Sequence, residues 1–185
     1  MRVIASYPPA VTPEQFLASV PVADPDDLMA IADKLAAATD VVERGAGRIL
    51  ARRDLELTAP EGAWSRWWLP IAPVISIASV EVLHRDGQTW EAVDPSRYRL
   101  ARGHDEPQLV WRDGGVVDRE VRVRVTAGHT TDAVPLGLRR AVILLAKEWC
   151  DADLAIEGKI EAPVLSFGVR SLIRQNRYRR PREVA

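Results

Sequence analysis

The sequence predicts an α+β fold in which a small bundle of about four helices carries an inserted antiparallel β-rich unit. Two long stretches have apolar residues at helical spacing, one from Asp24 to about Leu50 and one beginning at Val134-Pro135. Between them, apolar residues alternate with polar ones in short runs, as in strands. No helix-length segment separates these runs, which excludes a parallel α/β sheet. The insertion therefore lies between the first long helix and the third helix.

The expected organisation is one structural domain in four parts. An N-terminal helical part covers residues 1–50, the antiparallel β unit covers 51–128, the helical part resumes over 129–162, and a C-terminal docking segment covers 163–185. A chain of 185 residues fits one domain and buries enough surface to fold without a disulfide or a metal.

Charge and cysteine content limit the function classes. The formal net charge of −1 argues against electrostatic nucleic-acid binding by the molecule as a whole. The single cysteine cannot form an intramolecular disulfide. No signal-peptide pattern is present, and no apolar run approaches the roughly 18 residues of a membrane span. We expect a protein made in the cytosol, with no membrane partner.

Helix ends are marked by short polar motifs. Thr12-Pro13-Glu14-Gln15 predicts a capping box and a short helix through about Ser19. Asp24-Pro25-Asp26-Asp27 repeats this logic, with carboxylates at the positive end of the long helix. Gly45 and Gly47 predict that the long helix ends or bends there. Its apolar stripe comprises Leu28, Ile31, Leu35, Ala38, Val42 and Ile49.

Turn signals subdivide the β unit. Asp86-Gly87 predicts a hairpin turn, and Asp113-Gly114-Gly115 predicts another. The alternating runs around them contain Leu55 and Leu57, then Ile75, Ile77, Val80 and Val82, then Trp90 and Val93, Tyr98 and Leu100, Leu109 and Trp111, and finally Val121, Val123 and Val125.

The titratable residues form no recognisable catalytic or metal-binding pattern. His84, His104 and His129 lie on different predicted strands or turns, without the spacing of a zinc site. Cys150 adjoins Trp149, which favours a core or half-buried thiol over a nucleophile. We expect no cofactor, no metal and no enzymatic activity.

Three tryptophans, Trp64, Trp67 and Trp68, lie close together at the start of the β unit. On a continuous strand, Trp67 would face the side opposite to Trp64 and Trp68. Core packing, a contact between subunits and stacking on a ligand all remain open for this cluster. We take the three residues as candidates for a subunit interface.

The C-terminal segment is strongly basic. From Arg170 to Ala185 the chain has six arginines and one glutamate, a net charge of +5. A last short helix, Val169 to about Arg177, places apolar and basic residues on opposite sides. A solvated end, phosphate contacts with nucleic acid and docking on an acidic protein surface all remain open. The docking candidates are Phe167, Val169, Arg170, Leu172, Ile173, Arg174, Arg177 and Tyr178.

Three separated stretches together resemble the head–tail connector (adaptor, or head-completion) proteins of tailed phages and phage-derived gene transfer agents. They are Leu69-Pro70 with Pro73-Val74 and Ser79-Val80; Val125-Thr126-Ala127-Gly128-His129 with Val134-Pro135-Leu136, Leu138-Arg139 and Ala141; and Leu165-Ser166-Phe167-Gly168-Val169-Arg170-Ser171-Leu172. The order and spacing of these stretches carry the resemblance, which covers about residues 11–180.

The resemblance implies a structural protein of the particle neck, assembled in the bacterial cytoplasm. Such proteins form a ring of about twelve copies, join the portal protein to a neck, stopper or tail-terminator protein, and line the channel through which DNA passes without sequence recognition. It also implies that the segment from Phe167 to about Arg180 reaches into the portal, and we expect this segment to become ordered on docking. The alternative function is a β-rich nucleic-acid-binding module that uses the basic tail.

Overall fold

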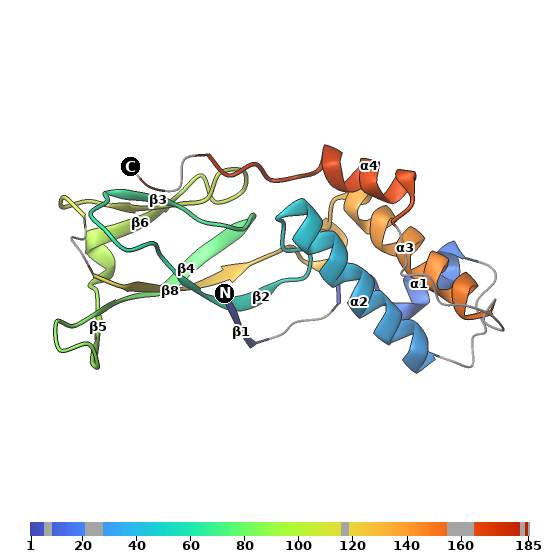
Figure 1. Cartoon of the computed structure of the whole chain (residues 1–185), viewed down its shortest axis with the longest axis horizontal. Helices are drawn as coiled ribbons and strands as arrows, with labels where there is room; N and C mark the ends of the chain where they lie inside the picture. The colour runs from blue at the N-terminus through green and yellow to red at the C-terminus, as the bar shows by residue number, and fades with distance from the viewer. Residues whose placement is uncertain (6–8, 21–27, 116–118, 155–164, 182–183, 185) are drawn as a thin grey trace. The chain divides into compact units, whose positions relative to one another are not determined.

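The computed structural model describes residues 1–5, 9–20, 28–115, 119–154, 165–181 and 184, and it confirms the α+β class (Figure 1). The chain divides into two compact units. We call residues 1–7, 47–129 and 178–185 the β unit, and residues 8–46 and 130–177 the helical unit. The two chain ends therefore belong to the β unit, whereas we expected residues 1–50 to form one helical part.

The helical unit contains α1 (Pro13–Ser19), α2 (Leu28–Ala46), α3 (Leu136–Leu154) and α4 (Phe167–Gln175). The predicted capping box is present: Thr12 Oγ1 accepts a hydrogen bond from the N–H of Gln15, whose side chain accepts one from the N–H of Thr12. The predicted helix start at Asp24-Pro25-Asp26-Asp27 lies outside the described residues. The buried core includes Phe16, Ile31, Leu35, Ala38, Val42, Leu138, Ala141, Val142, Leu145, Val169 and Ile173.

Two glycines lie at the end of α2. Gly45 faces α4 so tightly that a Cβ there would lie 2.9 Å from Ile173 Cγ2. Gly47 adopts φ +62°, the left-handed conformation in which helices commonly end. The predicted end of the long helix near Gly45 and Gly47 is therefore confirmed.

The β unit contains two antiparallel sheets. The five-stranded sheet has the order β1-β2-β8-β4-β5, and the three-stranded sheet has the order β3-β7-β6. The strands are β1 (Arg2–Ala5), β2 (Arg53–Thr58), β3 (Arg66–Trp68), β4 (Val74–Leu83), β5 (Trp90–Ala92), β6 (Tyr98–Ala101), β7 (Gln108–Trp111) and β8 (Val121–Ala127).

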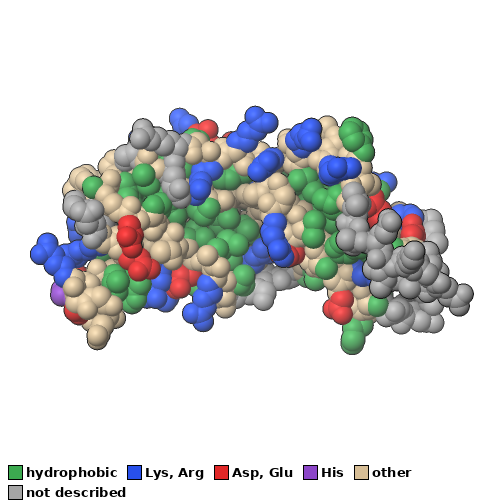
Figure 2. Space-filling model, in the orientation of Figure 1, with side chains coloured by type: hydrophobic (Ala, Val, Ile, Leu, Met, Phe, Trp, Pro, Cys, Tyr) green, Lys and Arg blue, Asp and Glu red, His purple; other side chains and the backbone are tan. Residues whose placement is uncertain are grey.

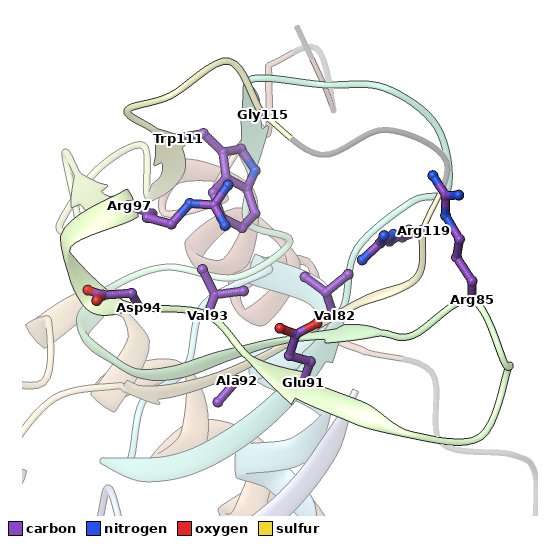
Figure 3. A pocket seen from close by; sticks show the side chains of 10 residues that line it. All are labelled: Val82, Arg85, Glu91, Ala92, Val93, Asp94, Arg97, Trp111, Gly115 and Arg119. Atoms are coloured by element: carbon purple, nitrogen blue, oxygen red, sulfur yellow. The ribbon is translucent and has the colours of Figure 1, made fainter.

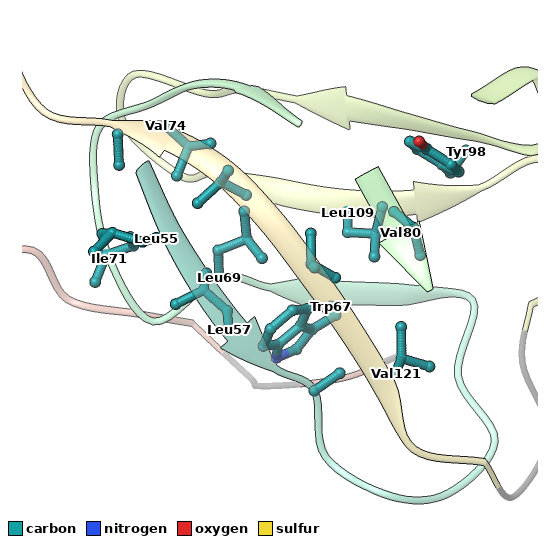
Figure 4. Packing of buried hydrophobic residues seen from close by; sticks show 14 of the residues in the cluster. Leu55, Leu57, Trp67, Leu69, Ile71, Val74, Val80, Tyr98, Leu109 and Val121 are labelled. Atoms are coloured by element: carbon teal, nitrogen blue, oxygen red, sulfur yellow. The ribbon is translucent and has the colours of Figure 1, made fainter. Parts of the chain in front are cut away.

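Side chains of both sheets form one hydrophobic cluster (Figure 4). Leu55 and Val80 from the five-stranded sheet join Trp67, Tyr98 and Leu109 from the three-stranded sheet. Because side chains alternate along a strand, this burial turns the intervening residues outward. The core thus determines which residues each sheet presents on its outer face.

One of the two predicted hairpin turns is confirmed. The Asp86 carboxylate accepts hydrogen bonds from the N–H groups of Gln88 and Thr89, which lower its pKa to about 2, and Gly87 adopts φ +69° between β4 and β5. The prediction of a hairpin at Asp113-Gly114-Gly115 is wrong, because this segment lies between β7 and β8, which belong to different sheets.

The C-terminal chain is part of the β unit. Tyr178 is 8% exposed, and its hydroxyl donates a hydrogen bond to the carbonyl of Leu69, 3.1 Å away. Burial raises the pKa of Tyr178 to about 12. Val184 then forms an antiparallel bridge with Trp67. These contacts hold the end of the chain against its own β unit.

We predict that Gly115→Ala destabilises the protein much more than Gly114→Ala. Both glycines have positive φ, +94° and +91°, so alanine costs about 1–2 kcal/mol at either position. At Gly115 a Cβ would also lie 2.2 Å from the carbonyl oxygen of Trp64, whereas at Gly114 nothing lies within 4 Å. Urea denaturation of the two variants measures the difference; equal losses would contradict the close approach at Gly115.

We predict that Tyr178→Phe lowers the free energy of unfolding by about 1 kcal/mol near neutral pH, because the Leu69 carbonyl loses its donor. The raised pKa favours the neutral phenol in the folded state. The contribution of this hydrogen-bonded phenol to the free energy of unfolding is complete below about pH 10 and is lost as pH rises through about 12. Denaturation at about pH 8 and about pH 11 should show the advantage of the wild type shrinking; a constant difference would contradict this assignment.

Candidate partner-binding surfaces

The amphipathic helix α4 fixes the first candidate surface. The Ser166 hydroxyl caps the helix by accepting from the N–H of Val169. Val169 and Ile173, four residues apart, are buried in the core of the helical unit. Helical spacing then places Arg170 and Arg174 on the exposed side of α4.

The structure separates the eight docking candidates into three groups: buried, half-buried and exposed. Three candidates, Val169, Ile173 and Tyr178, are buried within their own units. They stabilise the fold and are not part of the proposed partner surface. Leu172 is half-buried. Four residues remain exposed, and we call them the α4 surface: Phe167, Arg170, Arg174 and Arg177.

Phe167 is the most exposed large apolar residue in the described part of the chain, at 83%. An aromatic ring beside arginines is typical of the anchor residues of protein interfaces. Because α4 is already folded and packed on its apolar side, the α4 surface is preorganised. The expectation that this segment orders only on docking therefore does not hold for Phe167–Gln175.

The tryptophan cluster is mostly core. Trp67 is 1% exposed and Trp64 is 4% exposed, with their ring centroids 6.1 Å apart. The expected alternation fails at Trp64 because this residue precedes β3, and its indole N–H donates to the carbonyl of Pro60. Only Trp68 is partly exposed, and the Arg66 guanidinium lies 5.3 Å from its ring centroid.

A cleft of about 550 Å³ opens in the β unit. Figure 3 shows Arg97 and Arg119 reaching into it from opposite sides, near Val82 and Val93. Its described lining contains no Ser, Thr, Cys, His or Lys. The Asp94 carboxylate is occupied by the hydroxyl and N–H of Ser96, which lower its pKa. The described lining therefore offers no pair of a hydroxyl or thiol nucleophile with a histidine base.

Two histidines that lie far apart in the sequence meet in the β unit. The rings of His104 and His129 pack edge to face with centroids 6.2 Å apart. Burial lowers the pKa of His129, and the charges of His104 and Arg48 lower it further.

Among the described residues, no group of three His, Cys, Asp or Glu side chains could hold a metal ion. Cys150 is half-buried.

The described helices include none that is long and apolar enough to cross a membrane.

The sequence did not predict a surface on the three-stranded sheet, where Arg66 and Arg99 flank Val110. The alternation of apolar and polar residues within each short strand indicated which side chains face outward. The order of the strands, which brings Arg66, Val110 and Arg99 together, could not be derived from the sequence.

No protein-family model matches the chain, and no curated protein matches its sequence. Solved structures do. Chains in the neck of an empty GTA particle computed with C6 symmetry and in the neck of a native GTA particle computed with C12 symmetry share 23% identity with this chain, at TM-scores of 0.76 and 0.74. A chain in the virion of a native gene transfer agent (GTA) particle shares 24%, at 0.76. Each alignment covers 97% of this chain and 96% of the matched chain. At the level of the fold, these matches confirm the resemblance found in the sequence.

Proposed function

We propose that this chain is a structural head–tail adaptor of a phage or phage-like particle. The observation that carries the proposal is the shared fold: almost the whole chain aligns with almost the whole of chains in gene transfer agent neck and virion structures. The proposed role is to join the portal to the next neck or tail component and to line the DNA channel. It requires no catalytic step, and its location is the neck of the particle after assembly in the bacterial cytoplasm.

The adaptor would act as a ring of about twelve copies. The matched necks were computed with C6 and C12 symmetry, which supports a ring for this chain as well. A closed ring needs two unlike, complementary faces on each subunit. Trp68 is the one member of the tryptophan cluster with a partly exposed ring, so it is the remaining candidate of that cluster for a contact beyond the subunit.

The α4 surface is the proposed contact with the portal. Phe167 supplies an exposed apolar anchor, and the guanidinium groups of Arg170, Arg174 and Arg177 can bind carboxylates in bidentate fashion. The packed apolar side of α4 fixes the backbone of the helix, so docking orders the exposed side chains without also having to fold the helix. The proposed partner surface is therefore acidic, with a pocket for one aromatic ring.

The alternative, a nucleic-acid-binding module, loses part of its basis in the structure. Trp64 and Trp67 are buried and cannot stack on bases. Arginines of the C-terminal segment remain exposed, so phosphate contacts are tested together with portal binding.

We predict that the double variant Arg170→Glu and Arg174→Glu weakens portal binding at least tenfold, because charge reversal replaces attraction by repulsion at two contacts. Phe167→Ser should weaken binding by a similar factor. Arg140→Glu, an exposed arginine of α3, is the matched control and should bind like the wild type. Mixing each protein with purified portal rings, followed by electron microscopy and quantitative sedimentation, measures the effect.

Point substitutions are the appropriate test, because removing α4 would also remove Val169 and Ile173 from the core. Equal portal binding by the double variant and the wild type would refute docking through the α4 surface. Steeply salt-dependent binding to duplex DNA, lost in the same variant without any effect on portal binding, would favour the alternative function.

A further inference from the structure

The outer face of the three-stranded sheet carries a second basic surface. In β3, Trp67 points into the core, so Arg66 and Trp68 lie on the outer side. In β7 and β6, burial of Leu109 and Tyr98 likewise turns Val110 and Arg99 outward. We call Arg66, Trp68, Arg99 and Val110 the β3-β7-β6 face.

The strand register places three of these residues in one row. Val110 is paired with Arg66 on one side and with Arg99 on the other. Adjacent strands lie about 4.8 Å apart, so the two arginine Cα atoms are about 10 Å apart across an apolar centre. The Arg66 guanidinium packs over Trp68, which restricts its side chain.

This face carries the positive charges of two arginines. Among the described residues, neither Arg66 nor Arg99 forms an ion pair, and both are exposed. The five-stranded sheet differs, because Arg124 and Arg122 on its outer side pair with Glu56 and Glu81. Basic side chains also appear along the upper margin of the β unit in Figure 2.

The face is hollowed into a groove of about 620 Å³. Besides the four residues already named, Leu100, Ala101, Arg102, Glu106, Gln108 and Pro181 line it. Arg102 is neutralised by Glu106, 2.8 Å away, at the margin of the groove. The groove is therefore lined by basic side chains, with the apolar residue Val110 between Arg66 and Arg99.

We propose that the β3-β7-β6 face binds an acidic amphipathic helix of a neighbouring particle protein. Seven residues of an α-helix rise about 10.5 Å, which matches the separation of Arg66 and Arg99. A helix lying across the strands would bring one carboxylate to each arginine and an apolar residue, midway between them, onto Val110. An extended segment fits less well, because side chains on one of its faces repeat about every 6.8 Å.

Nucleic acid is the less suitable occupant. Arg66 already covers a face of the Trp68 ring, so a base would have to displace it before stacking there. The apolar centre of the row, Val110, offers a phosphate backbone no hydrogen-bond donor. Both features suit a helix with two carboxylates around an apolar residue.

The test uses the full chain and a fluorescent alanine-based helical peptide with two glutamates seven residues apart and a leucine four residues after the first glutamate. We expect Arg66→Glu and Arg99→Glu each to weaken peptide binding at least tenfold in fluorescence anisotropy. The matched control is Arg85→Glu, an exposed arginine in the turn between β4 and β5, which should bind like the wild type. Peptides with glutamine in place of glutamate, or with the glutamates four residues apart, should also bind at least tenfold more weakly.

Absence of peptide binding, or equal loss in the Arg85→Glu control, would overturn the proposal. Tighter binding of a single-stranded oligonucleotide that is lost in the Arg66→Glu and Arg99→Glu variants would also overturn it. The proposal does not rest on docking through the α4 surface. The Arg170→Glu, Arg174→Glu variant should bind the peptide normally, so failure of one surface is distinguishable from failure of the other.

Discussion

Burial of one face of each element is the constraint on which the surfaces of this protein depend. Trp67 and Leu109 must lie between the two sheets, and this leaves Arg66 and Val110 on the outside. The same rule acts on α4 with a different period, because burial of Ile173 leaves Arg174 exposed. The cores thus determine on which side of each element the charges lie, and the backbone geometry sets the spacing of the arginine Cα atoms.

Local signals in the sequence predicted local structure well. The capping box at Thr12, the helix end near Gly47 and the turn at Asp86-Gly87 each depend on neighbouring residues, and the structure confirms all three. The sequence predictions were wrong where a segment pairs with residues far away in the sequence. Gly114 and Gly115 predicted a hairpin, yet β7 before them and β8 after them belong to different sheets, and β8 pairs with β2 and β4.

The C-terminal segment shows why composition alone could not resolve the site. A net charge of +5 predicted one docking tail, but the segment serves both units. Val169 completes the helical core, whereas Tyr178 is hydrogen-bonded to the Leu69 carbonyl in the β unit. Apolar residues among arginines look alike in sequence whether they anchor a partner or their own fold, and only the long-range contacts distinguish the two.

Arginine chemistry links the two proposed surfaces. Of the 25 basic residues in the chain, 22 are arginine, and neither the α4 surface nor the β3-β7-β6 face contains a lysine. Guanidinium groups bind carboxylates in a planar, bidentate geometry and pack on aromatic rings, as Arg66 does on Trp68. A long neutral side chain in their place would keep the packing and lose the attraction. Both proposed surfaces would therefore suit acidic protein partners that present carboxylates at a defined spacing.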